Sequence, residues 1–213
     1  MLRPTLMFLI LVFLSYNLDA QSRWGVRLGG NLSTLKITGY CTSGCSVINQ
    51  NRTLSTGFQV GLSANHQLRP GWSLDTDVIY SRRGYGVDIY GELHSRLNYL
   101  SLPLLLNIQL LDSPIDILAG LETGILLSAT DYLNGARQKV KEQWHEIDAG
   151  INLGVAYRFS PAIRVKMSYL LGFFSIYKSS EAGRGGYWGG GAGLKMRSFQ
   201  FSVYTYPFQG RES

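Results

Sequence analysis

Two cysteines near the start of this 213-residue chain are placed to form a disulfide bond. Cys41 and Cys45 are its only cysteines, and an even number of cysteines in an exported protein favours their pairing. A metal site would need more ligands than two sulfur atoms, and the nearest histidine, His66, is distant in sequence. We therefore expect a Cys41–Cys45 disulfide and no metal site.

Catalytic chemistry could be built around a histidine. His145 could be brought together with Ser128 and with Glu142 or Glu146, the residue types that a lipid-modifying hydrolase combines. No nucleophile motif surrounds the serine, and a histidine in a loop usually contacts water. We therefore expect no enzyme activity and no cofactor.

Charged residues of both signs alternate with apolar residues along several segments and could pair inside a folded chain. Buried charges are tolerated when they are paired. If the polar face points inward, these groups form an ion-paired plug, with Arg83 and Glu146 at its rims in water. The ion-pair candidates are Arg27, Asp75, Asp77, Glu122, Asp148, Arg158, Arg164 and Lys166.

The segments that carry these residues have a period of two. Phe58, Val60 and Leu62 alternate with polar or small residues, whereas a helix would space apolar residues three and four apart. Most of the eight segments have ten or more residues, which exceeds the usual length of globular strands. They are Trp24–Leu35, Gly57–Gln67, Trp72–Arg83, Asn98–Leu110, Ile115–Ala129, Trp144–Phe159, Ile163–Phe174 and Phe199–Tyr206.

Short and long gaps take turns between these segments. The short gaps, 68–71, 111–114 and 160–162, each contain a proline and read as tight turns. The long gaps are 36–56, 84–97, 130–143 and 178–186. This alternation is typical of an outer-membrane barrel, with turns on the periplasmic side and loops outside.

One face of the segments is apolar and the other is polar and rich in glycine. Leucines such as Leu100, Leu102 and Leu104 share the apolar face, which we expect to meet lipid. Aromatic residues gather at segment ends, where interfacial girdles lie. The expected girdle residues are Trp24, Trp72, Tyr80, Trp144, Tyr157, Phe159, Tyr177 and Phe208.

The N-terminus reads as an export signal. Arg3 precedes a nine-residue apolar run, Leu6–Leu14, and Ala20 offers a small residue before a cut at Gln21. Nine apolar residues are too few to span a bilayer as a helix, which needs about 20. The net charge of +6 is not gathered into a basic block, so we expect no nucleic-acid partner.

These observations predict an all-β chain with one domain. Residues 1–20 form a cleaved signal peptide, and residues 21–213 form a single closed eight-stranded antiparallel up-and-down transmembrane β-barrel in the outer membrane. Eight strands leave an interior that side chains can fill. Pro103 cannot donate to a β-ladder, so we expect a local break in strand pairing beside it.

The mature chain resembles the PorT-like outer-membrane β-barrel domain family of Bacteroidota. Its most specific match is Tyr99–Leu106, YLSLPLLL, which looks like the family's YL-x-[IL]-P-L-L-L strand. Weaker matches are Gly25–Asn31, Leu118–Gly120 and Gly154–Tyr157. The resemblance implies an outer-membrane barrel and permits a role beside a secretion machine.

The function we expect is that of a small, non-conducting or nearly non-conducting outer-membrane barrel with a structural, adhesive or assembly-associated role. Its partners would be outer-membrane lipid and a protein that binds through the long loops or the periplasmic rim. Two alternatives remain: a barrel that holds a small apolar ligand, as lipocalins do, and, less favoured, a lipid-modifying enzyme.

Overall fold

The computed structural model describes residues 22–38, 51–88, 92–177 and 193–209, and most of them lie in eight long strands. Among these residues, no helix is long and apolar enough to cross a membrane. The long strands are β1 (Ser22–Thr38), β3 (Ser55–Arg69), β4 (Trp72–Asp88), β5 (Glu92–Gln109), β6 (Ile115–Leu133), β8 (Ile147–Arg158), β9 (Ile163–Gly172) and β10 (Gly193–Gln209). The short elements are β2 (Arg52–Thr53), β7 (Ala136–Lys139) and the 3-10 helix η1 (Lys141–Gln143).

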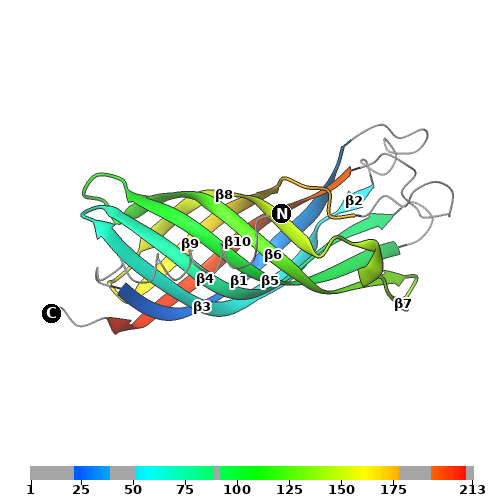
Figure 1. Ribbon diagram of the computed structural model, residues 1–213, viewed down its shortest axis with the longest axis horizontal. Helices are drawn as coiled ribbons and strands as arrows, with labels where there is room; N and C mark the ends of the chain where they lie inside the picture. The colour runs from blue at the N-terminus through cyan, green and yellow to red at the C-terminus, as the bar shows by residue number, and fades with distance from the viewer. Residues whose placement is uncertain (1–21, 39–50, 89–91, 178–192, 210–213) are drawn as a thin grey trace, which may run out of the picture.

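The eight long strands form a ring in which each pairs antiparallel with two neighbours. The order is β4, β3, β1, β10, β9, β8, β6 and β5, and the pairing of β4 with β5 completes the ring. The first and last strands pair directly, with Arg23 opposite Gln209. The strands run obliquely around the long axis of the molecule (Figure 1).

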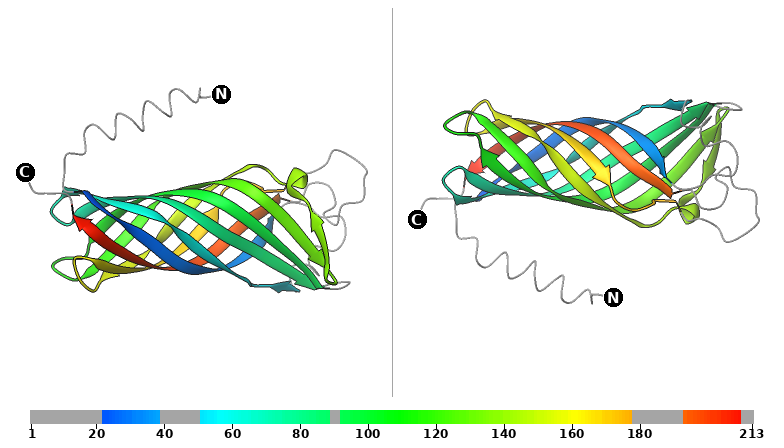
Figure 2. Two further views of the ribbon diagram at one scale, coloured as in Figure 1. Left: turned by 90° about the horizontal axis from the view of Figure 1, so that it is seen from below. Right: turned by 90° about the horizontal axis from the view of Figure 1, so that it is seen from above.

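The two ends of the ring differ. At the end that we call the turn end, tight turns join β3 to β4, β5 to β6 and β8 to β9, and the described chain begins and stops there. Gly71 adopts a positive φ of 77° in the first of these turns, a conformation that favours glycine. The opposite end, which we call the loop end, carries β2, β7 and η1 (Figure 2).

All eight predicted strands are present, but the expected loop 84–97 is wrong over most of its length. β4 continues to Asp88, and β5 begins at Glu92. Tyr85 and Val87 are buried, so the alternation continues beyond Arg83. Gly84 and Gly86 gave this stretch the composition of a loop, although its residues pair in register with β5.

The predicted orientation of the two faces is confirmed. On β5, Leu100, Leu102 and Leu104 are exposed, with Leu104 at 42% exposure, whereas Tyr99 and Leu105 are fully buried inside the ring. Apolar side chains dominate the outward positions of the other strands as well, among them Leu28, Phe58, Leu121, Leu153 and Phe201. An outward apolar face and a polar interior are the reverse of a soluble barrel.

Pro103 interrupts one of the two ladders of β5. The β4–β5 ladder lacks pairs at Leu102 and Pro103 and resumes in the same register at Ser101. The ladder to β6 continues through this point, with Pro103 opposite Glu122. The predicted break is therefore present on the β4 side, where the proline nitrogen cannot donate.

Candidate functional site

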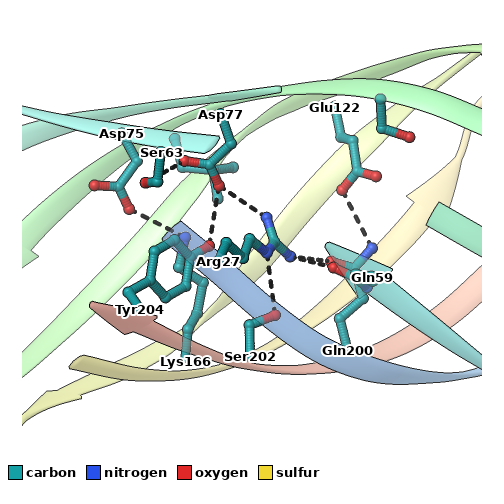
Figure 3. Close-up of polar contacts among 12 residues, drawn as sticks. Arg27, Gln59, Ser63, Asp75, Asp77, Glu122, Lys166, Gln200, Ser202 and Tyr204 are labelled. Atoms are coloured by element: carbon teal, nitrogen blue, oxygen red, sulfur yellow. Dashed lines mark hydrogen bonds and ion pairs between the residues drawn. The ribbon is translucent and has the colours of Figure 1, made fainter. Parts of the chain in front are cut away.

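The interior of the ring centres on Arg27 of β1. Its guanidinium donates to the Asp77 carboxylate at 2.8 Å, to Gln59 Oε1 at 2.6 Å and to Gln200 Oε1 at 3.1 Å (Figure 3). Nε also donates to the Ser202 hydroxyl at 3.1 Å. The residue is fully buried, so these partners replace the water that a guanidinium would otherwise hold.

A second group of charges lies around Asp75 of β4, toward the turn end. The Asp75 carboxylate accepts from Lys166 Nζ at 3.0 Å and forms an ion pair with Arg164, both residues of β9. Strands β4 and β9 are not neighbours in the ring, so these pairs cross the interior. The Tyr206 hydroxyl accepts from Arg164 at 3.0 Å and lies 3.3 Å from Ser63, which donates to Asp77 at 2.6 Å. The two groups are thereby joined.

A third group extends the network toward the loop end. Glu122 of β6 forms an ion pair with Arg83 of β4 and accepts from Asn152 at 2.7 Å and from Gln200 at 3.2 Å. Arg83 also lies 4.0 Å from the Asp148 carboxylate. The expectation that Arg83 sits at the rim in water is wrong, because its side chain is 2% exposed. Gln200 contacts both Arg27 and Glu122 and joins this group to the first.

The charges of this network balance. Four buried cations, Arg27, Arg83, Arg164 and Lys166, face four buried anions, Asp75, Asp77, Glu122 and Asp148. A buried charge is costly unless it is paired and hydrogen-bonded, and each of these eight has an opposite charge within 4.0 Å. The network therefore fills the interior with fixed, neutralised charge.

Two of the charged residues considered from sequence lie apart from this network. Arg158 pairs with Asp116 at 3.1 Å near the turn end, and its side chain is 38% exposed. This position at the start of a turn places it at the rim rather than in the interior. Glu146, expected at a rim, is exposed.

An apolar cluster lies above the network at the loop end. Its members are Leu35, Tyr85, Val87, Leu97, Tyr99, Leu126, Ala129, Val140, Trp144, Ile176, Tyr177, Leu194 and Met196. Val140 and Trp144 come from the connection between β7 and β8, and Ile176 and Tyr177 come from the segment after β9. We call these four residues the cap, because they are the members of the cluster that lie outside the eight ring strands.

The cap is held by specific contacts. A β-bridge joins Trp144 to Tyr177, whose rings lie edge to face with centroids 5.5 Å apart. Burial raises the pKa of the Tyr177 phenol further above neutral pH, where an ordinary tyrosine is already protonated. The expectation that Trp144 and Tyr177 belong to an outer girdle is wrong, because both are buried in this cluster. Trp24, Tyr157 and Phe159 do face outward, with Trp24 at 57% exposure.

The remaining candidates are the two cysteines and the residues of the possible hydrolase site. Cys41 and Cys45 lie outside the described residues. His145 is exposed, and its backbone N–H donates to the Ile176 carbonyl at 2.8 Å, while the Ser128 hydroxyl accepts from Asn98. In the described ranges, no group of three or more His, Cys, Asp or Glu side chains could hold a metal ion.

Sequence reasoning overlooked the neutral residues that connect the charges. Gln59, Gln200 and Asn152 are all buried and bridge the ion pairs. Their inward parity on alternating strands was the available signal. Their bridging role was missed because an amide side chain on a polar face, unlike a charged one, does not require a partner of opposite charge.

Comparisons with known proteins agree with this architecture. Residues 17–178 match the family described as outer membrane protein beta-barrel domain. Neisserial surface protein A is similar in structure, with a TM-score of 0.54 and 15% identity, covering 88% of this chain and 99% of that one. The attachment invasion locus protein Ail of Yersinia pestis (TM-score 0.46, 12% identity, 87% and 98% covered) and OprG of Pseudomonas aeruginosa (0.41, 12%, 88% and 93%) are also similar. No curated protein matches the chain in sequence.

Proposed function

The chain belongs to the outer membrane protein beta-barrel domain family, and from this premise we propose that it is a non-conducting structural barrel that presents its loop end outside the cell. Its location is the outer membrane. In this proposal the eight-stranded ring is a closed barrel that crosses the membrane, with the outward apolar face in lipid. It has no catalytic role.

The observation that carries this proposal is the filled interior. Four cations and four anions, joined by buried amides and hydroxyls, occupy the space through which water and ions would pass. Eight strands leave an interior that side chains alone can fill. The cap adds an apolar layer at the loop end. Such an interior does not support the alternative of a small apolar ligand held inside the ring.

The orientation and the contact surface follow from the two ends. Short turns face the periplasm in outer-membrane barrels, and longer connections face outward. We place the turn end in the periplasm and propose that a protein partner binds at the loop end or at the periplasmic rim. The Tyr99–Leu106 strand supports membership of the PorT-like branch of the family. An adhesive role and a role in assembly both fit this arrangement.

Planar-bilayer recording of the purified full chain tests the proposal. We expect no steady conductance, because ions would have to displace a paired and buried network. Recovery from the outer-membrane fraction and a heat-dependent shift in gel mobility would establish that the same sample is folded and inserted. Stable openings of porin size from folded protein would contradict the proposal.

A further inference from the structure

Five cations lie on the outward face of the ring near the loop end. They are Lys36 of β1, Arg82 of β4, Arg96 of β5, and Lys195 and Arg197 of β10, and we call them the cationic belt. Each is exposed or half-buried. None of the five forms an ion pair with any residue that the structure describes.

Like charges stand directly opposite one another within the belt. Lys36 pairs in register with Lys195, and Arg197 lies two residues farther along β10, opposite Thr34. Like charges that face each other across a ladder destabilise a sheet. The arrangement therefore calls for a compensating anion, and none of the described side chains of the ring strands supplies one.

The acidic side chains that the structure describes in the ring strands are directed away from the belt. Asp75, Asp77, Asp116, Glu122 and Asp148 are all buried. The remaining acid whose side chain is described in the ring strands, Asp131, accepts a hydrogen bond from buried Ser95. The described outward face thus carries cations at the loop end and no carboxylate to neutralise them.

Two of the belt cations are held against aromatic rings. The Arg82 guanidinium lies 5.0 Å from the centroid of Phe58 and donates to Asn98 at 3.3 Å. Arg96 lies 4.7 Å from the centroid of Tyr132. These contacts fix the guanidinium groups on the surface without neutralising their charge.

The belt lies at the height where the hydrocarbon layer should end. Arg82 is ten residues beyond Trp72 (82 − 72), where β4 begins, and Lys36 is fourteen beyond Ser22 (36 − 22), where β1 begins. Tilted strands rise roughly 2.5 Å per residue along the barrel axis, so ten to fourteen residues rise roughly 25–35 Å and end just beyond an apolar band of ~25 Å. Nearer the turn end, β1 and β10 present Leu28, Leu32 and Phe201 outward. The belt is thus at the headgroup level.

We propose that the cationic belt binds the phosphate groups of anionic lipid headgroups in the leaflet at the loop end. The inference rests on the proposed membrane crossing and its orientation. Arg and Lys donors suit phosphate oxygens, with arginine able to bind two oxygens at once. The bound phosphates neutralise Lys36 and Lys195, so the lipid completes the outer border of the ring.

Lipid binding by the full chain in phosphatidylcholine nanodiscs tests the proposal. The discs carry bisphosphorylated lipid A or its dephosphorylated form, and native mass spectrometry reads the lipid retained on the released protein. We expect Lys36→Gln/Lys195→Gln/Arg197→Gln to weaken lipid A binding on the order of 100-fold, because each cation near an anionic surface contributes roughly fivefold. The dephosphorylated form should bind the unaltered protein as weakly as lipid A binds this variant.

The matched control removes the same charge at the same end of the molecule. Arg137, Lys139 and Lys141 lie on β7 and η1, outside the ring, so their triple glutamine variant should retain lipid A like the unaltered protein. Equal losses in the two triple variants, or equal binding of the two forms of lipid A, would overturn the proposal. So would displacement of lipid A by an equal concentration of inorganic phosphate.

A second variant tests the belt at strands other than β1 and β10. Arg82→Gln/Arg96→Gln alters β4 and β5 instead, and it should weaken lipid A binding on the order of tenfold. Unchanged binding in this variant would exclude β4 and β5 from the belt. Heat-modifiable mobility of each sample separates the two proposals: unaltered protein that does not insert would overturn the proposed function, whereas inserted protein without phosphate-dependent binding overturns the belt alone.

Discussion

At the scale of single residues, Glu122 is the acceptor that three elements share. It accepts from Arg83, Asn152 and Gln200. We expect Glu122→Gln to lower the free energy of unfolding by about 3 kcal/mol, because Arg83 remains buried with only the Asp148 carboxylate, 4.0 Å away, to offset its charge. Urea unfolding in detergent micelles, followed by tryptophan fluorescence, measures the change.

The exposed Glu142 of η1 provides the control for this substitution. Glu142→Gln makes the same chemical change in water and should alter the unfolding free energy by less than about 0.5 kcal/mol. Adding Arg83→Gln and Asp148→Asn to Glu122→Gln should recover part of the loss, because this triple variant leaves neither Arg83 nor its second partner, Asp148, buried without an opposite charge. Equal midpoints for the two single glutamate variants would show that Glu122 is not a buried partner.

Neighbouring residues on β5 test which face meets lipid. Leu104 faces outward near the middle of the expected apolar band, so Leu104→Arg should cost roughly 2–4 kcal/mol in bilayers. Leu105 packs inside with Leu118 and Ala156, so Leu105→Arg should also destabilise, but through the interior. Unfolding in bilayers made from lipids of increasing acyl-chain length separates the two effects.

Only the Leu104→Arg cost should grow with bilayer thickness, because only that cation lies in hydrocarbon. Leu111→Arg, at a turn residue that is 86% exposed, should change little in any lipid. Identical thickness dependence at positions 104 and 105 would refute the assignment of the two faces.

Apart from Arg83 and Arg158, the residue pattern predicted the interior charges, but it did not predict their partners. Alternation alone places Asp75 and Arg164 on the polar face, because each side chain's direction depends only on local parity. Their pairing depends on how far the strands are staggered around the ring, since β4 and β9 are not adjacent. No feature of either segment encodes that stagger. The bridging role of Gln200 could not be predicted either, because it depends on the same stagger.

At the scale of elements, the cap is the part that packs from outside the ring. Trp144 is 1% exposed and joins its connection to Tyr177. Trp144→Ala should destabilise the packing of the cap by about 3–5 kcal/mol, the usual cost of truncating a buried tryptophan. We expect faster proteolysis of the loop end, while the ring keeps its heat-dependent gel mobility.

Phe174 lies in the same connection as Tyr177 and is 62% exposed. Phe174→Ala should therefore leave the cleavage rate close to that of the unaltered protein. A Trp144→Ala protein that resists protease as well as the Phe174→Ala protein would show that the cap does not depend on this tryptophan.

The sequence predicted the existence of the elements better than their ends. The eight strands were visible because an apolar outward face imposes a strict period of two. β7 was not, since Ala136–Lys139 is exposed on every side and leaves no alternation. Trp144 was assigned to a strand because an aromatic beside an alternating segment looks the same whether it faces lipid or folds over the end of the ring.

At the scale of the whole molecule, stability depends on two different environments, the hydrocarbon around the ring and the polar interior within it. The outward leucines favour hydrocarbon, while the interior charges are held by ion pairs and hydrogen bonds to one another. Detergent exchange should therefore act on the outer face and leave the interior pairs in place. This division explains how a chain with only 16% charged residues places eight of them in its core.

Because β1 pairs with β10, the chain could begin at a different strand and still form the same ring. Arg23 stands opposite Gln209, so a short peptide could join the two chain ends without crossing the ring. A circularly permuted gene that starts at Trp72, directly after the first tight turn, would encode the same pairs of neighbouring strands. We expect this permutant to refold with the same heat-dependent gel shift. Failure of the permutant, with the linked but unpermuted chain refolding, would mean that assembly must begin from one particular hairpin.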